Sequence, residues 1–266
     1  METKMTKTMQ ALALVAFTCI MGLAIGEEAP TLRSQIEDSL DIAEVPSGFP
    51  VGFCLLTAGK TQYVAYYDKL RRMTVASRPL DSNKWSYQVL PSKVGWDSHN
   101  YITMAMDDDG YLHVSGNMHS VPLIYFRMEK PGDIATLKKL SMTGNTEKRC
   151  TYPMFMRDAE NRLIFHYRDG GSGRGSEIYN VYDLKTKIWT RLLDTPLTDG
   201  QGNMNAYMQG PVRGPDGLFH MIWVWRDTPD CATNHHLSYA RSKDLIHWES
   251  AFGDKVNLPL TISEKK

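Results

Sequence analysis

The fold is decided by the stretch DGYLHVS (Asp109–Ser115), an Asp-Gly turn that leads into a short strand-like run. Asp-Gly turns followed by runs of aromatic and aliphatic residues predict β-hairpins. The same layout returns three more times along the chain, in Gln62–Tyr67, Asn161–Tyr167 and Asp216–Trp223. Successive copies lie about 50 residues apart, a period typical of propeller blades rather than of helical solenoids.

A second predicted strand follows each copy, and these strands are Met73–Ser77, Leu123–Arg127, Ile178–Asp183 and Leu237–Ser242. We therefore expect an all-β protein, a β-propeller of four-stranded antiparallel blades stacked so that few sheet edges stay open. A β-sandwich built from the same hairpins is the alternative. The segment Ser242–Trp248 (SKDLIHW) looks like a degenerate Asp-box, the turn that recurs in sialidase-type propellers.

The N-terminus predicts export. Lys4 and Lys7 precede an apolar run, Ala11–Ala24, which ends in the small residues of an Ala-Ile-Gly cleavage pattern. Such a stretch indicates a signal peptide, and it is short for a membrane anchor, which needs about 20 apolar residues. We expect a signal peptide over 1–26, an N-terminal segment over 27–47 and a propeller domain over 48–266, in a secreted or periplasmic protein.

Only about four to five blades fit into the chain, counted at about 50 residues each. We therefore expect an incomplete propeller, truncated at its C-terminus, because no segment after the last copy obviously closes a ring.

The charge and cysteine content exclude two classes of protein. The 30 Lys and Arg balance 30 Asp and Glu, and the sequence pI is about 7.1, which argues against a nucleic-acid binder. Once the predicted signal peptide is removed, three cysteines remain, Cys54, Cys150 and Cys231. An odd count leaves at least one thiol unpaired within the chain, so the sequence does not predict a disulfide scaffold.

Two histidines are the first candidates for chemistry. His99 lies directly before a predicted strand, and His119 follows the end of the next one. A hairpin would bring them together, and two imidazoles can exchange protons near neutral pH. The polar neighbours Asn100 and Asn117 make them candidates for substrate binding. A structural, hydrogen-bonding role for each histidine is the alternative.

Tyr152 and Arg168 form a second candidate pair. Tyr152 precedes a proline and therefore starts its strand in an extended or turn conformation. Arg168 ends the adjacent strand of the same predicted blade and opens a glycine-rich loop that lets a ligand approach the backbone. A tyrosine beside an arginine suits proton transfer next to a clamped carboxylate. A packed tyrosine and a surface arginine are the alternative.

The last repeat supplies weaker candidates for binding. Trp225, near a strand end, is a candidate sugar platform, and Arg226 and Tyr207 are candidates for contacts with an anionic substrate. Core and rim positions are the alternative for these residues. A structural zinc or calcium ion is a further hypothesis that no strong ligand spacing supports, and its candidate ligands are His220, Cys231, His235 and His236.

Taken together, the blocks around these residues resemble the BNR-repeat family that contains the ulvan lyases. The resemblance rests on Ser98–Ile102, Asp108–His119, Thr151–Pro153, Tyr167–Gly170 and Asn234–Ser242, which occur in the family's order. It implies a seven-bladed propeller that cleaves a sulfated, uronate-containing polysaccharide by β-elimination. It further implies that His99 and His119 are active-site histidines, that Tyr152 transfers a proton and that Arg168 neutralises the uronate.

Three functions follow as hypotheses. The first is an exported polysaccharide lyase, which needs no cofactor and works as a monomer on an acidic polysaccharide, with no nucleic acid or membrane partner. The second is a sialidase-type glycoside hydrolase, which requires paired carboxylates or a tyrosine–glutamate couple. The third is a non-catalytic carbohydrate-binding propeller that uses exposed tryptophans.

Overall fold

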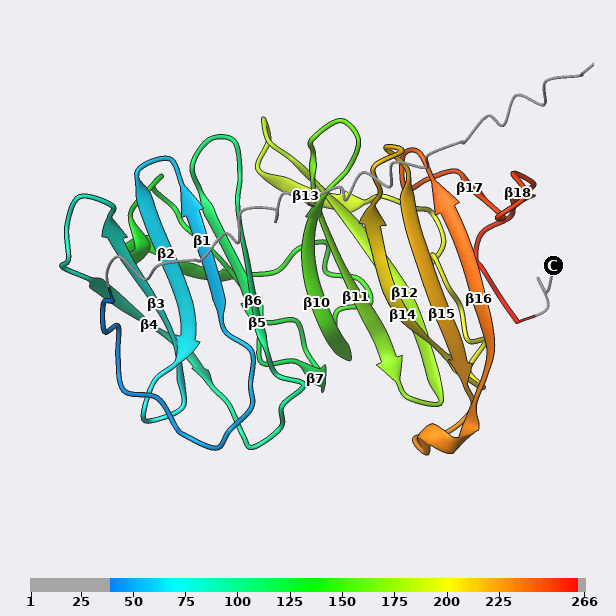
Figure 1. Ribbon diagram of the computed structural model, residues 1–266, viewed down its shortest axis with the longest axis horizontal. Helices are drawn as coiled ribbons and strands as arrows, with labels where there is room; N and C mark the ends of the chain where they lie inside the picture. Colours follow the sequence, from blue (N-terminus) through cyan, green and yellow to red (C-terminus); the bar gives the residue numbers. More distant parts are fainter. Residues whose placement is uncertain (1–38, 263–266) are drawn as a thin grey trace, which may run out of the picture. The chain divides into compact units, whose positions relative to one another are not determined.

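The computed structural model describes residues 39–262, and its regular structure there is β-strand apart from two single-turn 3₁₀ helices, η1 (Ile134–Thr136) and η2 (Cys231–Thr233). Among the described residues, those from 40 to 262 form one compact unit (Figure 1). The predicted all-β class is confirmed. The predicted signal peptide lies outside the described residues. No helix between residues 39 and 262 is long and apolar enough to cross a membrane.

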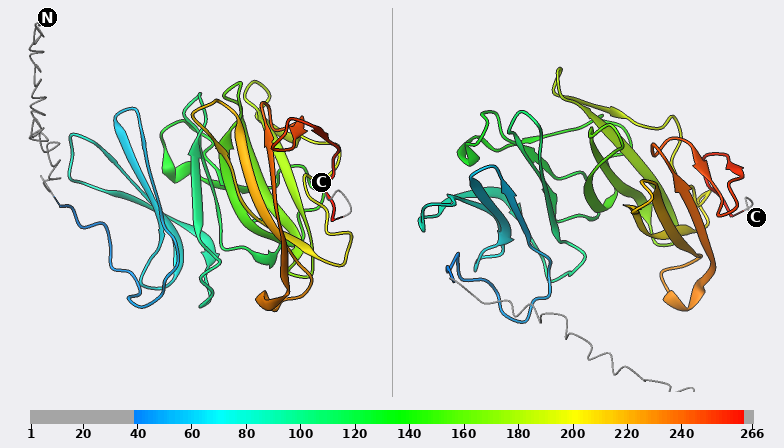
Figure 2. Two further views of the ribbon diagram at one scale, coloured as in Figure 1. Left: turned by 45° about the vertical axis from the view of Figure 1, so that its right-hand side comes forward. Right: turned by 45° about the horizontal axis from the view of Figure 1, so that its top comes forward.

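The strands form four antiparallel sheets that follow one another in sequence order (Figures 1 and 2). The first sheet contains β1 (Cys54–Ala58), β2 (Thr61–Tyr67), β3 (Arg72–Pro79) and β4 (Ser86–Lys93). The second contains β5 (Ile102–Met106), β6 (Leu112–Gly116), β8 (Tyr125–Arg127) and β9 (Lys138–Leu140). The third contains β7 (His119–Val121), β10 (Cys150–Arg157), β11 (Leu163–Gly171), β12 (Arg174–Asp183) and β13 (Ile188–Arg191). The fourth contains β14 (Asn205–Arg213), β15 (Phe219–Arg226), β16 (Asn234–Ser242), β17 (Trp248–Glu249) and β18 (Lys255–Val256).

The repeated turns use left-handed residues, as the sequence predicts. Gly110 and Gly217 have φ values of +84° and +81°, and Asn161 takes the equivalent place in the third copy with φ of +63°. Asparagine is one of the few side chains that tolerate this conformation, so the third turn forms without glycine.

The core lies between neighbouring sheets. Along β11, alternate side chains point to opposite faces, and both faces are buried. Phe165 and Tyr167 pack in one cluster with Tyr125 of the second sheet, whereas Ile164 packs in another with Trp223 of the fourth. The third sheet is therefore covered on both sides, as expected of a blade inside a propeller.

The predicted Asp-box turn is present in the fourth sheet. The Ser242 hydroxyl accepts hydrogen bonds from the Asp244 and Leu245 amides at 3.2 and 2.9 Å. The Asp244 carboxylate accepts from the Ile246 and His247 amides at 2.8 and 2.7 Å. Trp248 closes the turn: its ring is 2% exposed, and its Nε1 donates to the Leu245 carbonyl at 3.1 Å.

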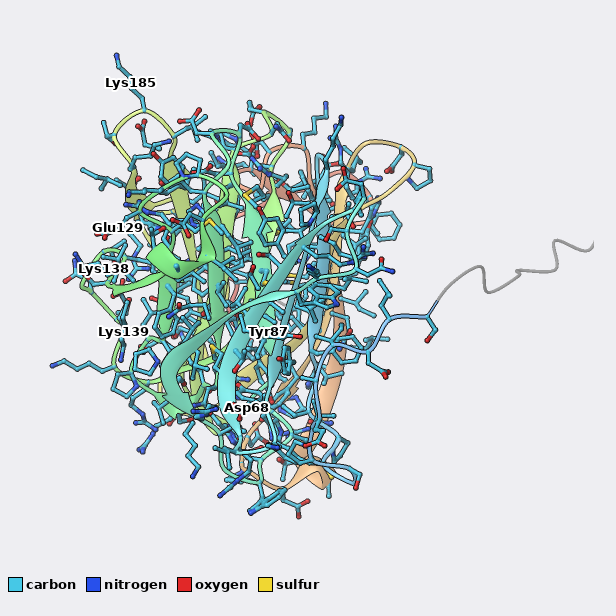
Figure 3. All side chains as sticks on the ribbon, turned by 90° about the vertical axis from the view of Figure 1, so that its left-hand side faces the viewer. Asp68, Tyr87, Glu129, Lys138, Lys139 and Lys185 are labelled. Atoms are coloured by element: carbon cyan, nitrogen blue, oxygen red, sulfur yellow. The ribbon has the colours of Figure 1, made fainter. Side chains whose placement is uncertain are left out.

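The segment that precedes the first strand packs along the first sheet. The Tyr87 hydroxyl on β4 donates to the Ile42 carbonyl at 2.7 Å, and Lys69 pairs with Glu44 at 2.9 Å. Figure 3 shows Tyr87 on the side of this sheet that faces the viewer.

The predicted four-stranded antiparallel blades are present, and the last two sheets each carry a fifth strand. The extra strand of the third sheet is β7. Instead of extending the second sheet, it pairs with β10, with Thr151 opposite His119. This pairing carries His119, which lies in sequence between β6 and β8 of the second sheet, to the edge of the third sheet, where β10 begins.

The cysteines lead to a first testable prediction. Cys54, Cys150 and Cys231 are all free thiols. Burial raises the pKa of Cys150 to about 12, whereas Cys231 is exposed in η2. Because the thiolate is the reactive form, we expect a thiol reagent to label Cys231 in the native protein and Cys150 only after unfolding. Mass spectrometry of labelled peptides measures this, and equal rates at both cysteines would contradict the packing.

Candidate active site

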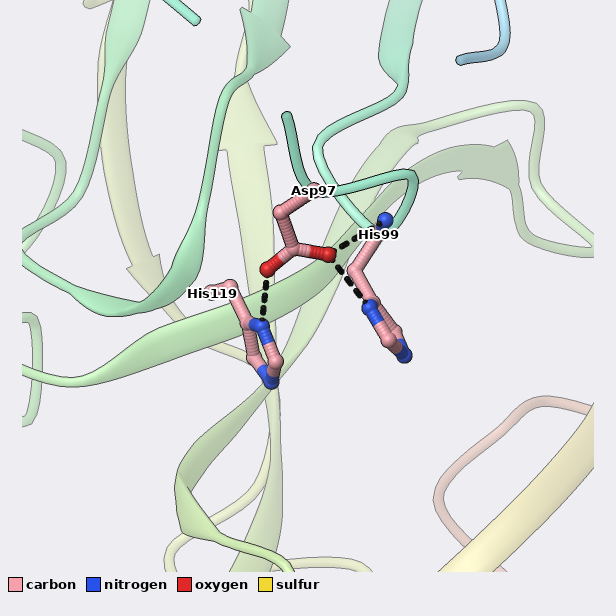
Figure 4. Close-up of side chains that lie close together, drawn as sticks. All are labelled: Asp97, His99 and His119. Atoms are coloured by element: carbon pink, nitrogen blue, oxygen red, sulfur yellow. Dashed lines mark hydrogen bonds and ion pairs between the residues drawn. The ribbon is translucent and has the colours of Figure 1, made fainter. Parts of the chain in front are cut away.

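The two predicted histidines meet through a carboxylate (Figure 4). Asp97 accepts the His99 backbone amide at 3.0 Å and faces His99 Nδ1 at 2.6 Å through the same oxygen. Its second oxygen faces His119 Nδ1. The two imidazole rings stack with their centroids 4.4 Å apart. Residues from two separate segments therefore form one compact group.

Asp97 is ionised in this arrangement. Burial alone would raise its pKa, but the hydrogen bonds from His119 and His99 outweigh burial and hold the pKa well below its usual range. An ionised carboxylate only accepts hydrogen bonds, so each histidine donates from Nδ1, and in a neutral imidazole this arrangement places the bare nitrogen at Nε2. The tautomers are assigned from this network.

The chain around His119 adopts strained conformations that fix its position. Asn117 and Ser120 have positive φ values of +58° and +55°, and left-handed residues other than glycine concentrate at functional sites. The Asn117 side-chain amide donates to Ser92 Oγ at 2.8 Å, which ties this turn to the first sheet.

Tyr152 and Arg168 lie together on the third sheet. Tyr152 has a φ of +57° at an irregularity of β10, between Thr151 and Met154. The Arg168 guanidinium carbon lies 4.9 Å from the centre of the Tyr152 ring. Burial raises the pKa of the Tyr152 phenol, and the charge of Arg168 opposes that rise. The phenol therefore keeps its proton at neutral pH and can act as a donor.

Arg168 is buried, with 1% of its surface exposed, which makes its sparse hydrogen bonding informative. Its Nη2 donates to Thr151 Oγ1 at 3.1 Å, and its Nε has no hydrogen-bond partner. The same Thr151 hydroxyl accepts the Ser120 amide at 2.8 Å, so this threonine links β7 to β11. Unpaired donors in a buried guanidinium are costly unless a ligand completes them.

The fourth sheet contributes two of the predicted binding residues. The Tyr207 ring lies 6.4 Å from the Tyr152 ring, centre to centre. The Arg226 guanidinium carbon lies 3.7 Å above the Tyr207 ring, and Arg226 Nε donates to Asn234 Oδ1 at 2.7 Å. Tyr207 thus lies between Arg168 and Arg226. His99 closes the group, since its ring centre is 6.0 Å from that of Tyr152.

Two predicted binding residues do not present their side chains to this group. Trp225 is 2% exposed and packs in the core between the third and fourth sheets, so the prediction of a sugar platform is wrong. Asn100 is 9% exposed, and its carbonyl accepts the Tyr67 hydroxyl at 2.6 Å, which gives it a packing role.

The predicted metal ligands of the fourth sheet do not converge as a set. His220 hydrogen-bonds to Asp216 and Tyr239, opposite Arg241 on β16, whereas His235 lies opposite Trp225 and pairs with Asp227 at 2.9 Å. Within residues 39–262, one group of three ligand side chains has spacing suited to a metal ion. It consists of Asp97, His99 and His119, with one ligand atom from each within 4.8 Å of the others.

Asp97 and Thr151 are the site residues that the sequence interpretation did not assign to this group. For Asp97 a signal was available, since an aspartate two residues before a histidine can accept that residue's backbone amide. For Thr151 no signal was available, because its role depends on β7 crossing to the third sheet.

A sequence model of BNR repeat-containing family members matches residues 61–266. The chain belongs to this family. A curated relative, the long isoform of an ulvan lyase from Glaciecola sp. (strain KUL10), is 23% identical over 142 residues, covering 48% of this chain and 14% of the relative. The match confirms the resemblance inferred from the sequence.

Two solved structures share the fold. The polysaccharide lyase Uly1 superposes with a TM-score of 0.66 at 18% identity, over 86% of this chain and 61% of that one. An ulvan lyase of the PL25 class bound to -[GlcA(1-4)Rha3S]- gives a TM-score of 0.61 at 15% identity, over 84% and 59%. This chain thus spans about three fifths of the solved relatives that it matches.

Proposed function

We propose that this protein is an exported polysaccharide lyase that cleaves a uronate-containing, ulvan-like polysaccharide by β-elimination. One observation carries the proposal: His99, His119, Tyr152 and Arg168 come from separate segments and form a single group. The similarity to proteins named as ulvan lyases supports the choice of substrate. The apolar N-terminal run supports export.

Arg168 binds the uronate carboxylate in this proposal. The proton on the carbon beside a charged carboxylate is weakly acidic, because its removal puts more negative charge on the same group. A guanidinium pairs with a carboxylate through two parallel hydrogen bonds and stabilises that developing charge. The buried, under-bonded guanidinium of Arg168 is suited to this task.

The histidines and Tyr152 then move the two protons. An imidazole Nε2, which Asp97 leaves unprotonated, accepts the proton from the carbon beside the carboxylate. We assign this to His119, because β7 pairs directly with the strand that carries Tyr152. A carbon–carbon double bond forms as the bond to the glycosidic oxygen breaks, and the Tyr152 phenol protonates that oxygen. Proton exchange with solvent restores both side chains, and no water is added to the sugar.

The remaining residues bind and orient the substrate. Tyr207 and Arg226 lie beside Tyr152 on the fourth sheet, where a ring and a second guanidinium suit a neighbouring anionic sugar. His99 shares Asp97 with His119 and stacks against it, which fixes the orientation of the base.

The experiment that tests the proposal compares ulvan with ulvan whose carboxyl groups have been reduced to alcohols. We expect ultraviolet absorbance from the unsaturated uronate to rise with native ulvan only, because reduction removes the group that Arg168 would bind. His119→Ala should abolish that rise. New reducing ends without absorbance would instead identify a hydrolase, and binding without cleavage would identify a carbohydrate-binding protein.

A further inference from the structure

We propose that Asp97, His99 and His119 form a binding site for one divalent transition-metal ion such as Zn²⁺, which switches both histidines to the other tautomer. Two imidazole nitrogens and one carboxylate are a ligand set that zinc commonly takes, with a fourth position left for water. One ligand atom from each residue lies within 4.8 Å of the others.

The geometry points to the Nδ1 atoms as the ligands. Both face the Asp97 carboxylate, each against a different one of its two oxygens, with the rings side by side (Figure 4). Ligand atoms around tetrahedral zinc lie about 3.4 Å apart, given metal–ligand distances of about 2.1 Å. When the ion binds, the Asp97 carboxylate therefore moves away from the imidazoles, and the two Nδ1 atoms approach each other. The side chains of His99, Asp97 and His119 are 46%, 37% and 36% exposed, so these shifts disturb little of the core.

Metal binding at Nδ1 reverses the protonation of each ring. In the metal-free site the proton of each neutral imidazole lies on Nδ1, where it is donated to Asp97. An ion binds Nδ1 only once that nitrogen has given up its proton, so each neutral ring carries its proton at Nε2 instead and no net proton is released. The charge of the ion is partly balanced by the ionised Asp97.

The metal-induced change of tautomer goes beyond the proposed function. Its effect on turnover, however, rests on the proposed lyase activity. The proposed elimination needs a bare Nε2 to accept a proton, and the metal-bound site offers only Nε2–H. Zinc bound on the side of the imidazoles that faces Asp97 would therefore inhibit the lyase reversibly. The binding itself requires no assumption about catalysis.

Binding is measured by competition with a fluorescent zinc chelator. The background protein carries Cys231→Ser and His235→Gln, so that these two candidate ligands on the fourth sheet do not contribute. We expect one zinc ion per chain, and at least tenfold weaker binding in Asp97→Asn and in His119→Gln. Asp216→Asn, which changes a carboxylate that contacts a single histidine, is the matched control and should bind as the background does.

Nitrogen NMR of the labelled imidazoles measures the switch directly, without any activity assay. We expect Nδ1 protonated before zinc is added, and Nδ1 metal-bound with Nε2 protonated afterwards. Equal zinc affinity of Asp97→Asn, His119→Gln and the background protein would overturn the site. Zinc bound through Nε2 would overturn the switch. Both results are independent of whether the protein cleaves ulvan, so they separate a failure here from a failure of the lyase proposal.

Discussion

Arg168→Gln is expected to lower kcat/KM on ulvan by roughly 10²–10³ while the protein stays folded. Glutamine keeps a polar side chain beside Thr151 but removes the positive charge that pairs with the uronate. The loss should fall mainly on kcat, because the negative charge grows as the proton is removed. Initial rates of absorbance increase measure the effect, with circular dichroism as the check on folding.

Arg162→Gln is the matched control for this prediction. Arg162 lies at the turn that precedes β11, where its half-exposed side chain pairs with the buried carboxylate of Asp158 at 2.6 Å. Its loss should leave turnover unchanged. Arg168→Lys keeps the charge without the planar fork and should fall between the wild type and Arg168→Gln. Wild-type turnover in a folded Arg168→Gln protein would remove Arg168 from the mechanism.

Trp225→Ala is expected to lower the free energy of unfolding by about 3–5 kcal/mol. The ring is buried between the third and fourth sheets, and its removal leaves a cavity among Ile164, Tyr179 and Ala206. Trp96→Ala is the comparison, because that ring is 70% exposed, and its loss should change the stability by less than about 0.5 kcal/mol. Urea unfolding followed by circular dichroism measures both variants.

A different result would restore the interpretation of Trp225 as a sugar platform. If Trp225→Ala kept the stability of the wild type and lost affinity for the polysaccharide instead, the ring would have to face the substrate. The core described between the third and fourth sheets would then be wrong.

The case of Trp225 shows where prediction from the sequence stops. Two-residue spacing correctly places Trp223 and Trp225 on one face of β15. It does not say which face is covered by the neighbouring sheet. Periodicity within one strand carries no information about partners that are distant in sequence.

The strand repeats were predictable because turn chemistry is local. The turns at Gly110 and Gly217 follow from glycine's freedom in the left-handed region, and the Asp-box at Ser242–Trp248 follows from side chains that bond to their own loop. The pairing of β7 with β10 was not predictable in this way. That strand has three residues, and its register depends on left-handed Asn117 and Ser120 rather than on a hydrophobic pattern.

Part of the candidate site was predictable for a related reason. His99, His119, Tyr152 and Arg168 all lie where predicted strands begin or end, and strand ends of neighbouring blades meet at one rim. The carboxylate that joins the two histidines depends on three-dimensional contact between loops. Asp97 therefore emerges only from the structure, although it determines which nitrogen of each ring can accept a proton.

Mass spectrometry of the fragments released from ulvan tests the central claim most directly. Elimination leaves each new non-reducing end with a double bond and a mass lower by one water than the hydrolytic fragment. We predict that every new non-reducing end released by the wild type is unsaturated, so that only the fragment carrying the original non-reducing end of each polymer is saturated, and that Arg168→Gln releases unsaturated ends roughly 10²–10³ times more slowly. Saturated sugars at the newly formed non-reducing ends, or unsaturated fragments that Arg168→Gln still releases at the wild-type rate, would contradict the assignment of these four side chains to one eliminating site.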